Sequence, residues 1–188
     1  MYKRYRKISY FTQFVFLSLA IIFQMVGMDM APKETEVKKR QVDIQTIQLM
    51  CALLHKKICI DNFTPELLVG LSRGGLIPLG FLAGEQMFNN RNTKIINIHS
   101  YNYDKRQAGI NLIMLPHLED ITNFKSMLVI DDLVDTGRSI EYLIDLLKKN
   151  TKNPTIKIAT LFYKPHSRIQ PDYYIEETKD WIVFPWEK

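Results

Sequence analysis

Three carboxylates lie close together in the segment LVIDDLVDTGRSI, directly after a run of apolar residues. Asp131 and Asp132 are adjacent, and Asp135 follows them after two apolar residues. Because like charges at this spacing repel one another, something cationic is expected to bind among them when they work. Hydroxyl groups and Mg²⁺ are partners that suit such oxygen atoms, so the segment indicates a ligand with hydroxyls, a metal ion, or both.

The residues that follow these acids are suited to bind phosphate. Thr136, Gly137 and Ser139 open the next expected helix, where free backbone amides and the helix dipole favour an anion. Acidic acceptors beside an anion site indicate a sugar phosphate as the ligand. A solvated acidic turn that caps a helix is the simpler interpretation of an isolated DxxDTG. The apolar strand before the segment and the helix after it make that interpretation less favoured here.

A second segment, GLSRGG, also contains residue types that suit a phosphate. Gly70, Gly74 and Gly75 allow the backbone to approach a ligand closely or to take unusual dihedral angles, and Arg73 supplies a cation. A pyrophosphate or a second phosphate is the expected ligand. A tight turn between a strand and a helix is the simpler explanation of this segment taken alone, so its value lies in its pairing with the acidic segment.

Both segments are expected at one edge of a sheet, because apolar runs with strand character alternate with helical spacing along the chain. Asp43 is the predicted N-cap of the first helix. The alternation predicts a right-handed α/β fold with a mainly parallel sheet flanked by helices, and ligands bind such a sheet beyond the carboxyl ends of its strands. The predicted strands lie within residues 65–75, 93–101, 125–132 and 155–165, and the predicted helices are 42–58, 76–88 and 137–150.

Two segments do not follow this alternation of strands and helices. The polar segment NYDKRQAG at residues 102–109 has no periodicity and is typical of a mobile loop. The aromatic-rich tail, residues 171–188, is expected to form a small appended lobe.

Length and composition fit one compact domain, since the chain has 188 residues and 46% hydrophobic content. The net charge of +5 is compatible with anionic partners, but part of it comes from basic clusters near the N-terminus. Cys51 and Cys59 have no CxxC spacing and no histidine cluster around them. This argues against a disulfide framework or a metal site and favours a reducing compartment.

The first residues, 1–36, are different in kind, because a basic cluster is followed by a long apolar run. Three interpretations stay open: an uncleaved membrane anchor, an export signal, or an extension upstream of a later start. The segment is therefore placed outside the fold, and the domain is expected to span residues 37–188. The candidate later starts are Met25, Met28 and Met30.

The acidic segment resembles the ribose-phosphate binding motif of the type I phosphoribosyltransferases. Within that superfamily the chain is similar to the bacterial xanthine-guanine phosphoribosyltransferases. Four blocks carry the resemblance over residues 42–188: LSRGGLIP, SYNYD, VIDDLVDTG, and FYKP followed by DYYIEETKDWIVFPWE. The resemblance implies the fold of that superfamily, with a small C-terminal hood at about residues 164–188. It also implies transfer of the ribosyl group of 5-phosphoribosyl 1-pyrophosphate to a purine nitrogen, with release of pyrophosphate.

The same resemblance implies a role for each motif residue. Asp131 and Asp132 would hold the ribose hydroxyls directly or through Mg²⁺. Asp135 would face N7 of the purine as a hydrogen-bond partner and general acid or base. Pyrophosphate would bind Ser72, Arg73 and Gly74, with a strained or cis peptide between the first two. The 5-phosphate would bind Thr136, Gly137, Arg138 and Ser139.

The tail would bind the base. Lys164 would donate to the 6-oxo group of the purine, a contact that the amino group of adenine could not accept. Trp181 would stack on the ring, with backbone carbonyls near Trp181 and Ile182 reading the 2-substituent. The loop SYNYDKRQAG would close over the site, although Asn102 and Tyr103 depart from the acidic and histidine residues common there. No catalytic role is assigned to the four histidines, His55, His99, His117 and His166.

The expected partners are phosphoribosyl pyrophosphate and a 6-oxopurine such as guanine or xanthine, with hypoxanthine as a further candidate. No nucleic acid partner is expected. A homodimer or homotetramer is expected from the resemblance, in the cytoplasm or attached to the inner face of the cell membrane. Three alternatives stay open: a phosphoribosyltransferase of other base specificity, a non-catalytic sensor of a nucleotide or of phosphoribosyl pyrophosphate, and a membrane-tethered binding protein.

Overall fold

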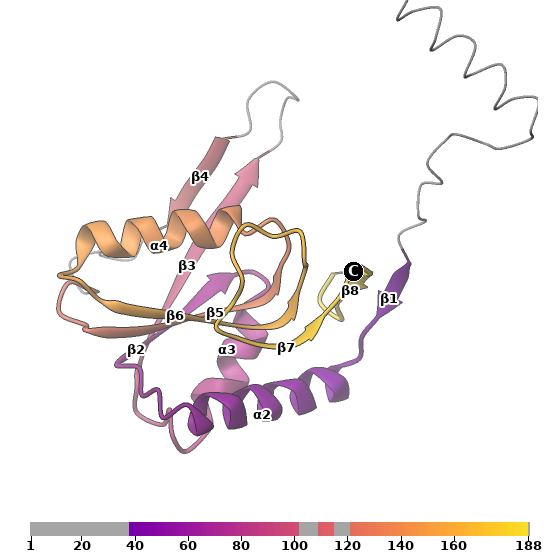
Figure 1. The fold of residues 1–188 in the computed structure, drawn as a ribbon, viewed down its shortest axis with the longest axis horizontal. Helices are drawn as coiled ribbons and strands as arrows, with labels where there is room; N and C mark the ends of the chain where they lie inside the picture. Colours follow the sequence, from indigo (N-terminus) through magenta and orange to yellow (C-terminus); the bar gives the residue numbers. More distant parts are fainter. Residues whose placement is uncertain (1–37, 102–108, 115–120, 188) are drawn as a thin grey trace, which may run out of the picture. The chain divides into compact units, whose positions relative to one another are not determined.

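The apolar runs of the sequence form the central strands of a six-stranded sheet (Figure 1). The computed structural model of the protein describes residues 38–101, 109–114 and 121–187. The strands of this sheet follow the order β4-β3-β2-β5-β6-β7. Their bounds are β2 Leu67–Ser72, β3 Asn92–Tyr101, β4 Gly109–Met114, β5 Ser126–Val134, β6 Thr155–Tyr163 and β7 Tyr173–Glu177.

Most of the sheet is parallel, as predicted. Strands β3, β2, β5, β6 and β7 run in one direction, and β4 pairs antiparallel with β3 at one edge. The predicted α/β fold with a mainly parallel sheet is thereby confirmed. Strand β4 is an addition that the sequence pattern did not predict. The predicted loop at residues 102–109 lies outside the described residues except for Gly109, which begins β4.

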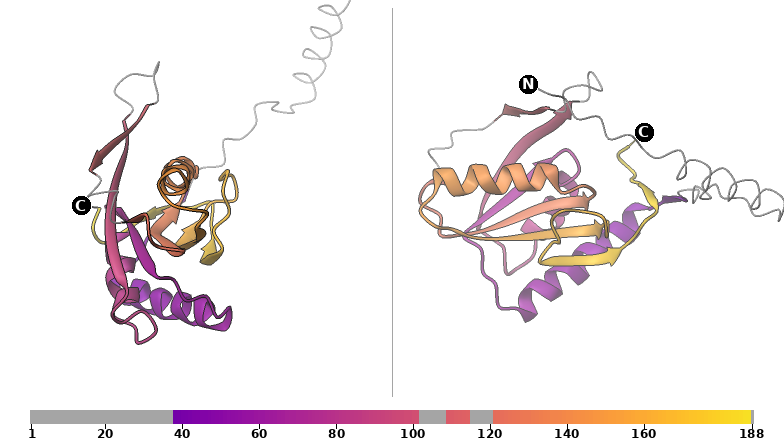
Figure 2. Two further views of the ribbon diagram at one scale, coloured as in Figure 1. Left: turned by 90° about the vertical axis from the view of Figure 1, so that its left-hand side faces the viewer. Right: turned by 45° about the horizontal axis from the view of Figure 1, so that its top comes forward.

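Helices cover both faces of the sheet. Helices α2 (Ile44–Ile60) and α3 (Leu76–Ala83) lie on one face, and α4 (Arg138–Asn150) lies on the other (Figures 1 and 2). Leu67 and Leu68 are consecutive residues of β2, and each is fully buried in a different one of the two hydrophobic clusters. Burial on both faces explains why the parallel strands read as continuous apolar runs.

Helix α2 begins where the sequence predicted. The carboxylate of Asp43 accepts a hydrogen bond from the backbone N–H of Thr46 at 2.7 Å, so Asp43 is the N-cap. Helix α3 ends at Ala83, earlier than the predicted boundary at residue 88. Phe88 lies in the turns that follow α3, and its side chain is buried. Because Phe88 is apolar and continues the helical spacing, the predicted helix was too long.

The aromatic-rich tail is divided between two sheets. Strand β7 extends the large sheet beside β6, whereas β8 (Trp181–Val183) pairs in parallel with β1 (Lys39–Gln41) in a separate two-stranded sheet. The expectation of one appended lobe at residues 171–188 was therefore wrong for β7. The small sheet is completed by β1, an N-terminal strand that the sequence pattern did not predict.

Within the described ranges, no helix combines the length and the apolar character needed to cross a bilayer. The predicted N-terminal segment, residues 1–36, lies outside the described residues. The three interpretations of that segment therefore stay predictions.

Candidate active site

Three loops meet at the carboxyl edge of the parallel sheet. Strands β2, β5 and β6 are neighbours in parallel register, so the segments that follow them emerge at the same edge. These segments are residues 72–75, which begin with the last residue of β2, residues 135–139, which lead from β5 into α4, and residues 164–169 after β6. The two motifs singled out in the sequence therefore lie beside one another, together with a third loop.

The acid pair lies within the last part of β5. The Asp131 Oδ1 atom accepts a hydrogen bond from the backbone N–H of Asp132 at 2.9 Å. Burial raises the pKa of Asp131 well above its ordinary value, and the neighbouring charge of Asp132 raises it further. Burial also raises the pKa of Asp132, to about 6, although hydrogen bonds to its carboxylate act in the opposite direction. Two acids that resist ionisation together make a site that gains from a bound cation.

The loop after β2 lies directly against this pair. A Cβ atom added to Gly74 would lie 2.3 Å from the Oδ1 atom of Asp132, so only glycine permits the observed approach. A Cβ atom on Gly75 would lie 2.4 Å from the backbone oxygen of Ile130 in β5. The peptide bond between Ser72 and Arg73 is cis, one of the two forms that the resemblance implied.

The loop after β5 leads into α4. Gly137 has a positive φ of 79°, in the left-handed region that favours glycine. It is the N-cap of α4 and supplies no side-chain hydrogen bond to the first turn. The backbone N–H of Arg138 is 3.5 Å from the Thr136 hydroxyl oxygen. Gly137 therefore caps none of the amides at the start of α4, and the 3.5 Å contact of Arg138 with Thr136 is long for a hydrogen bond, which suits the predicted phosphate site.

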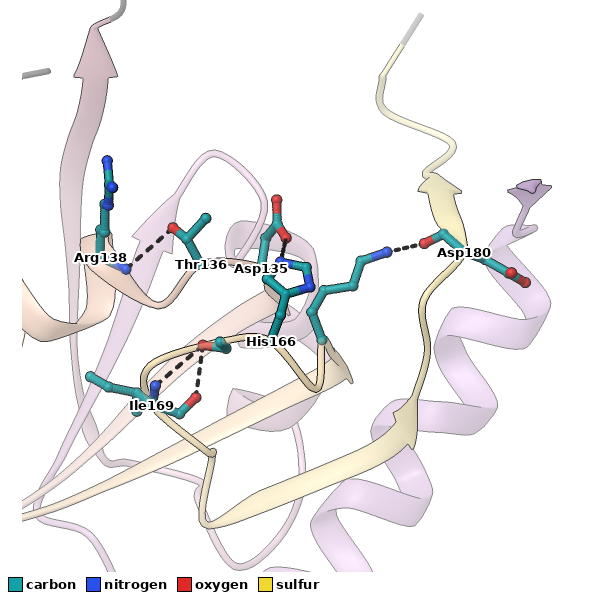
Figure 3. Close-up of polar contacts among 8 residues, drawn as sticks. Asp135, Thr136, Arg138, His166, Ile169 and Asp180 are labelled. Carbon is teal, nitrogen blue, oxygen red and sulfur yellow. Dashed lines mark hydrogen bonds and ion pairs between the residues drawn. The ribbon is translucent and has the colours of Figure 1, made fainter. Parts of the chain in front are cut away.

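The predicted base-binding residues come from β8 and from the start of the loop after β6. Lys164 is buried, with 6% of its surface exposed, and its Nζ atom donates to the backbone oxygen of Asp180, just before β8 (Figure 3). Trp181 is an exposed aromatic residue, with 58% of its surface accessible to solvent. Ile182 is buried in the core at 4%, so its side chain is packed with the core and its backbone is the part that suits the predicted role.

Two side chains reach the site that the sequence analysis did not assign to it. The Nε2 atom of His166 lies 2.9 Å from the Oδ1 atom of Asp135 (Figure 3). The indole Nε1–H of Trp186 donates to the Oδ2 atom of Asp132 at 3.3 Å. A signal for His166 was present, because it follows Lys164 closely in the loop after β6. No spacing pattern in the sequence connects Trp186 with the acid pair.

The comparisons with known proteins agree with this arrangement. The sequence profile of the phosphoribosyl transferase domain family matches residues 40–187. A xanthine-guanine phosphoribosyltransferase from Cereibacter sphaeroides is 33% identical over an alignment that covers 68% of this chain and 72% of that protein.

Two solved structures extend the similarity to the fold. The purine phosphoribosyltransferase from Pyrococcus horikoshii is 31% identical, with a TM-score of 0.70, over 80% of this chain and 95% of that one. A xanthine-guanine-hypoxanthine phosphoribosyltransferase from Helicobacter pylori is 27% identical, with a TM-score of 0.67, over 79% of this chain and 94% of that one. The resemblance found in the sequence motifs is confirmed: the chain belongs to the phosphoribosyl transferase family.

Proposed function

We propose that the protein transfers the 5-phosphoribosyl group of phosphoribosyl pyrophosphate to a 6-oxopurine, with release of pyrophosphate. The candidate acceptors are guanine, xanthine and hypoxanthine, and purine salvage is the process that such a reaction serves. The observation that carries the proposal is the contact between Gly74 and Asp132. It brings the proposed pyrophosphate loop against the proposed ribose site, as a substrate that joins the two groups requires.

The acid pair fits a Mg²⁺ ion that is shared with the substrate. In the part of the chain that the structure describes, no group of three or more His, Cys, Asp or Glu side chains could form a cage for a metal ion. Mg²⁺ commonly binds one or two carboxylates together with phosphate oxygens of the substrate, and Asp131 and Asp132 would supply those carboxylates. When bound, Mg²⁺ would stabilise the charge that develops on the leaving pyrophosphate.

The two loops would hold the sugar at both ends. Ser72, Arg73 and Gly74 would bind the pyrophosphate, and the start of α4 would bind the 5-phosphate. That second site consists of Thr136, Gly137, Arg138 and Ser139. A sugar fixed at both ends presents C1 to the incoming base in one orientation, and such positioning lowers the entropic part of the barrier. The transition state resembles an oxocarbenium ion, which the nearby carboxylates would stabilise.

The base would be recognised by three features. Lys164 would donate to the 6-oxo group, and as a buried cation it would reject the amino group of adenine. Trp181 would stack on the ring, and the backbone near Ile182 would contact the 2-substituent. Asp135 would accept the proton of N7 while N9 forms its bond to C1 of the ribose.

A spectrophotometric assay tests this function directly. The protein is mixed with phosphoribosyl pyrophosphate and Mg²⁺, and guanine, xanthine, hypoxanthine and adenine are added in separate reactions. Turnover of at least one 6-oxopurine with release of pyrophosphate is expected, and adenine should not react. If no 6-oxopurine reacts, the proposed function is wrong. Binding of phosphoribosyl pyrophosphate without any turnover would favour the sensor alternative.

The Asp135→Asn variant tests the role at the base. It should lower kcat far more than it weakens the binding of phosphoribosyl pyrophosphate, because Asp135 is proposed to contact the purine. Equal loss of both would remove that role. We further predict a homodimer or homotetramer that works in the cytoplasm, and light scattering would measure the oligomeric state.

A further inference from the structure

Asp135 has a partner that the proposed function does not use. The Nε2 atom of His166 lies 2.9 Å from the Asp135 Oδ1 atom, and Figure 3 shows the two side chains pointing toward one another from two different loops. Both side chains are largely exposed, at 61% for His166 and 53% for Asp135. A contact between two exposed side chains contributes little to stability even when both are charged, so a structural role is a weak explanation for this one.

Backbone hydrogen bonds hold the two loops together on both sides of the pair. The N–H of Lys164 donates to the oxygen of Val134 at 2.9 Å, and the N–H of Arg168 donates to the oxygen of Thr136 at 3.2 Å. Asp135 lies between the two acceptors in the chain, and His166 lies between the two donors. These backbone bonds therefore hold the two loops at a spacing that allows the side chains of His166 and Asp135 to meet.

Packing next to the pair reinforces this arrangement. A Cβ atom on Gly137 would lie 2.7 Å from the hydroxyl oxygen of Ser167, so the loops are in close contact there. The Ser167 hydroxyl donates to the backbone oxygen of Ile169 at 2.9 Å. The loop that carries His166 is thus internally bonded and rests against the loop that carries Asp135.

The other basic side chains of the same loop have different partners. Lys164 donates to the backbone oxygen of Asp180. Arg168 pairs with Glu141 of α4 at 3.8 Å. Of the three basic side chains in this loop, it is therefore His166 that contacts Asp135.

We propose that His166 is a positioning residue for Asp135, an inference that rests on the proposed function. By binding Oδ1, the imidazole fixes the rotamer of the carboxylate and leaves Oδ2 directed at the purine. In the transfer step the N7–H bond of the purine breaks and its proton goes to Oδ2. N9 forms the bond to C1 of the ribose, and the bond from C1 to the pyrophosphate oxygen breaks with its electron pair leaving on pyrophosphate. His166 takes no part in these bonds and holds the acceptor in place.

The effect expected from losing this contact is a kinetic one. A carboxylate that is half exposed and has lost its partner can take several rotamers, and small misplacements of a reacting group cost much of its contribution. The His166→Ala variant should lower kcat by about 10- to 100-fold. The KM for phosphoribosyl pyrophosphate should change by less than about threefold, since ribose and phosphate groups bind elsewhere in the site.

Conservative replacement separates positioning from bulk. His166→Gln places an amide N–H close to where Nε2 lies and should recover most of the lost kcat, whereas His166→Phe keeps a ring without a donor and should behave like the alanine variant. Arg168→Ala is the matched control, because Arg168 is equally exposed in the same loop and pairs with Glu141. Its kcat should equal that of the wild type.

A double-mutant cycle shows whether His166 acts through Asp135. In the Asp135→Asn background, His166→Ala should cause little further loss of kcat, because the group that it positions is already disabled. Additive losses, a wild-type kcat in His166→Ala, or no recovery by His166→Gln would overturn the inference. If His166→Ala does not fold, the comparison of His166→Gln with His166→Phe carries the same test.

Failure of this inference can be told from failure of the proposed function. If the wild type turns over a 6-oxopurine and the His166 variants match it, the proposed function stands and His166 has no positioning role. If the wild type turns over none of them, the proposed function and the inference that rests on it are both overturned.

Discussion

The Asp132 carboxylate fills the space that a side chain at Gly74 would need, because a Cβ atom there would lie 2.3 Å from Oδ1. Gly74→Ala should therefore push the Asp132 carboxylate out of its observed position. Because the aspartate side chain is short, it cannot make room and keep its carboxylate in the site. We expect the KM for phosphoribosyl pyrophosphate to rise by about tenfold or more, a loss that corresponds to at least about 1.4 kcal/mol of binding free energy. Steady-state kinetics at saturating base measure it.

Gly80→Ala is the matched control for that substitution. Gly80 lies in α3, and a Cβ atom there would meet nothing within 4 Å beyond its neighbours in its own helix. Alanine also favours a helix over glycine by up to about 1 kcal/mol. This variant should keep the wild-type KM and a slightly higher Tm. A Gly74→Ala enzyme with an unchanged KM would show that the contact with Asp132 has no bearing on substrate binding.

Trp186 is expected to set the pH range in which the acid pair works. Trp186→Phe keeps an aromatic ring to stack on Phe184, where the rings are 4.8 Å apart, but removes the N–H that bonds Asp132. Because that hydrogen bond lowers the pKa of Asp132, its loss should raise the pKa above about 6. In the profile of kcat/KM for phosphoribosyl pyrophosphate against pH, the acidic limb should shift to higher pH, by less than about one pH unit.

Trp181→Phe is the comparison for that measurement. Trp181 is proposed to contact the base, so this variant should raise the KM for the purine. The acidic limb of its kcat/KM profile should stay at the wild-type pH. A profile that moves equally in both variants would contradict a specific role of Trp186 at Asp132.

The sequence predicted the parts of the molecule that follow from local pattern. The strands β2 and β5 are continuous apolar runs because both faces of the sheet are covered. The start of α2 follows from the capping side chain of Asp43, and the apolar run before the acidic motif places that motif at a strand's end. In each case the determining residues are neighbours in the sequence.

The parts that the sequence did not predict depend on partners far away in the chain. Strand β1 has three residues and no apolar pattern, and it is a strand because it pairs with β8 at the other end of the domain. The contact between His166 and Asp135 needs the register of β5 against β6 and the backbone bonds between the following loops. Such contacts are fixed by tertiary geometry, which spacing in one sequence does not contain.

Lys164 should control the choice between 6-oxopurines and adenine. Lys164→Met removes the proposed donor to the 6-oxo group while keeping an unbranched side chain of similar length. We expect kcat/KM for guanine to fall by about 100- to 1,000-fold, and the difference between guanine and adenine to narrow, because discrimination through a buried hydrogen bond is lost. Kinetics with both bases measure the two effects.

The same substitution at Lys157, within β6, separates specificity from stability. Lys157 donates to the Tyr173 hydroxyl at 2.9 Å and pairs with Asp61, away from the base-binding residues. Lys157→Met should lower Tm and leave the guanine to adenine ratio unchanged. If Lys164→Met also keeps that ratio, Lys164 does not read the 6-oxo group.

The acid pair should make the stability of the metal-free protein depend on pH. Burial raises the pKa of Asp132 to about 6 in the folded state, above the value of about 4 expected in the unfolded chain. Stability from this group is therefore fully present below about pH 4 and is lost as the pH rises through about 6.

In urea denaturation with EDTA at pH 8, Asp132→Asn should exceed the wild type in free energy of unfolding by on the order of 1–3 kcal/mol. The difference should shrink as the pH falls towards 4. Added Mg²⁺ should stabilise the wild type more than the variant, since it binds the folded carboxylates. A wild type that is the more stable protein at pH 8 in EDTA would show that Asp132 carries no penalty for ionisation in the fold.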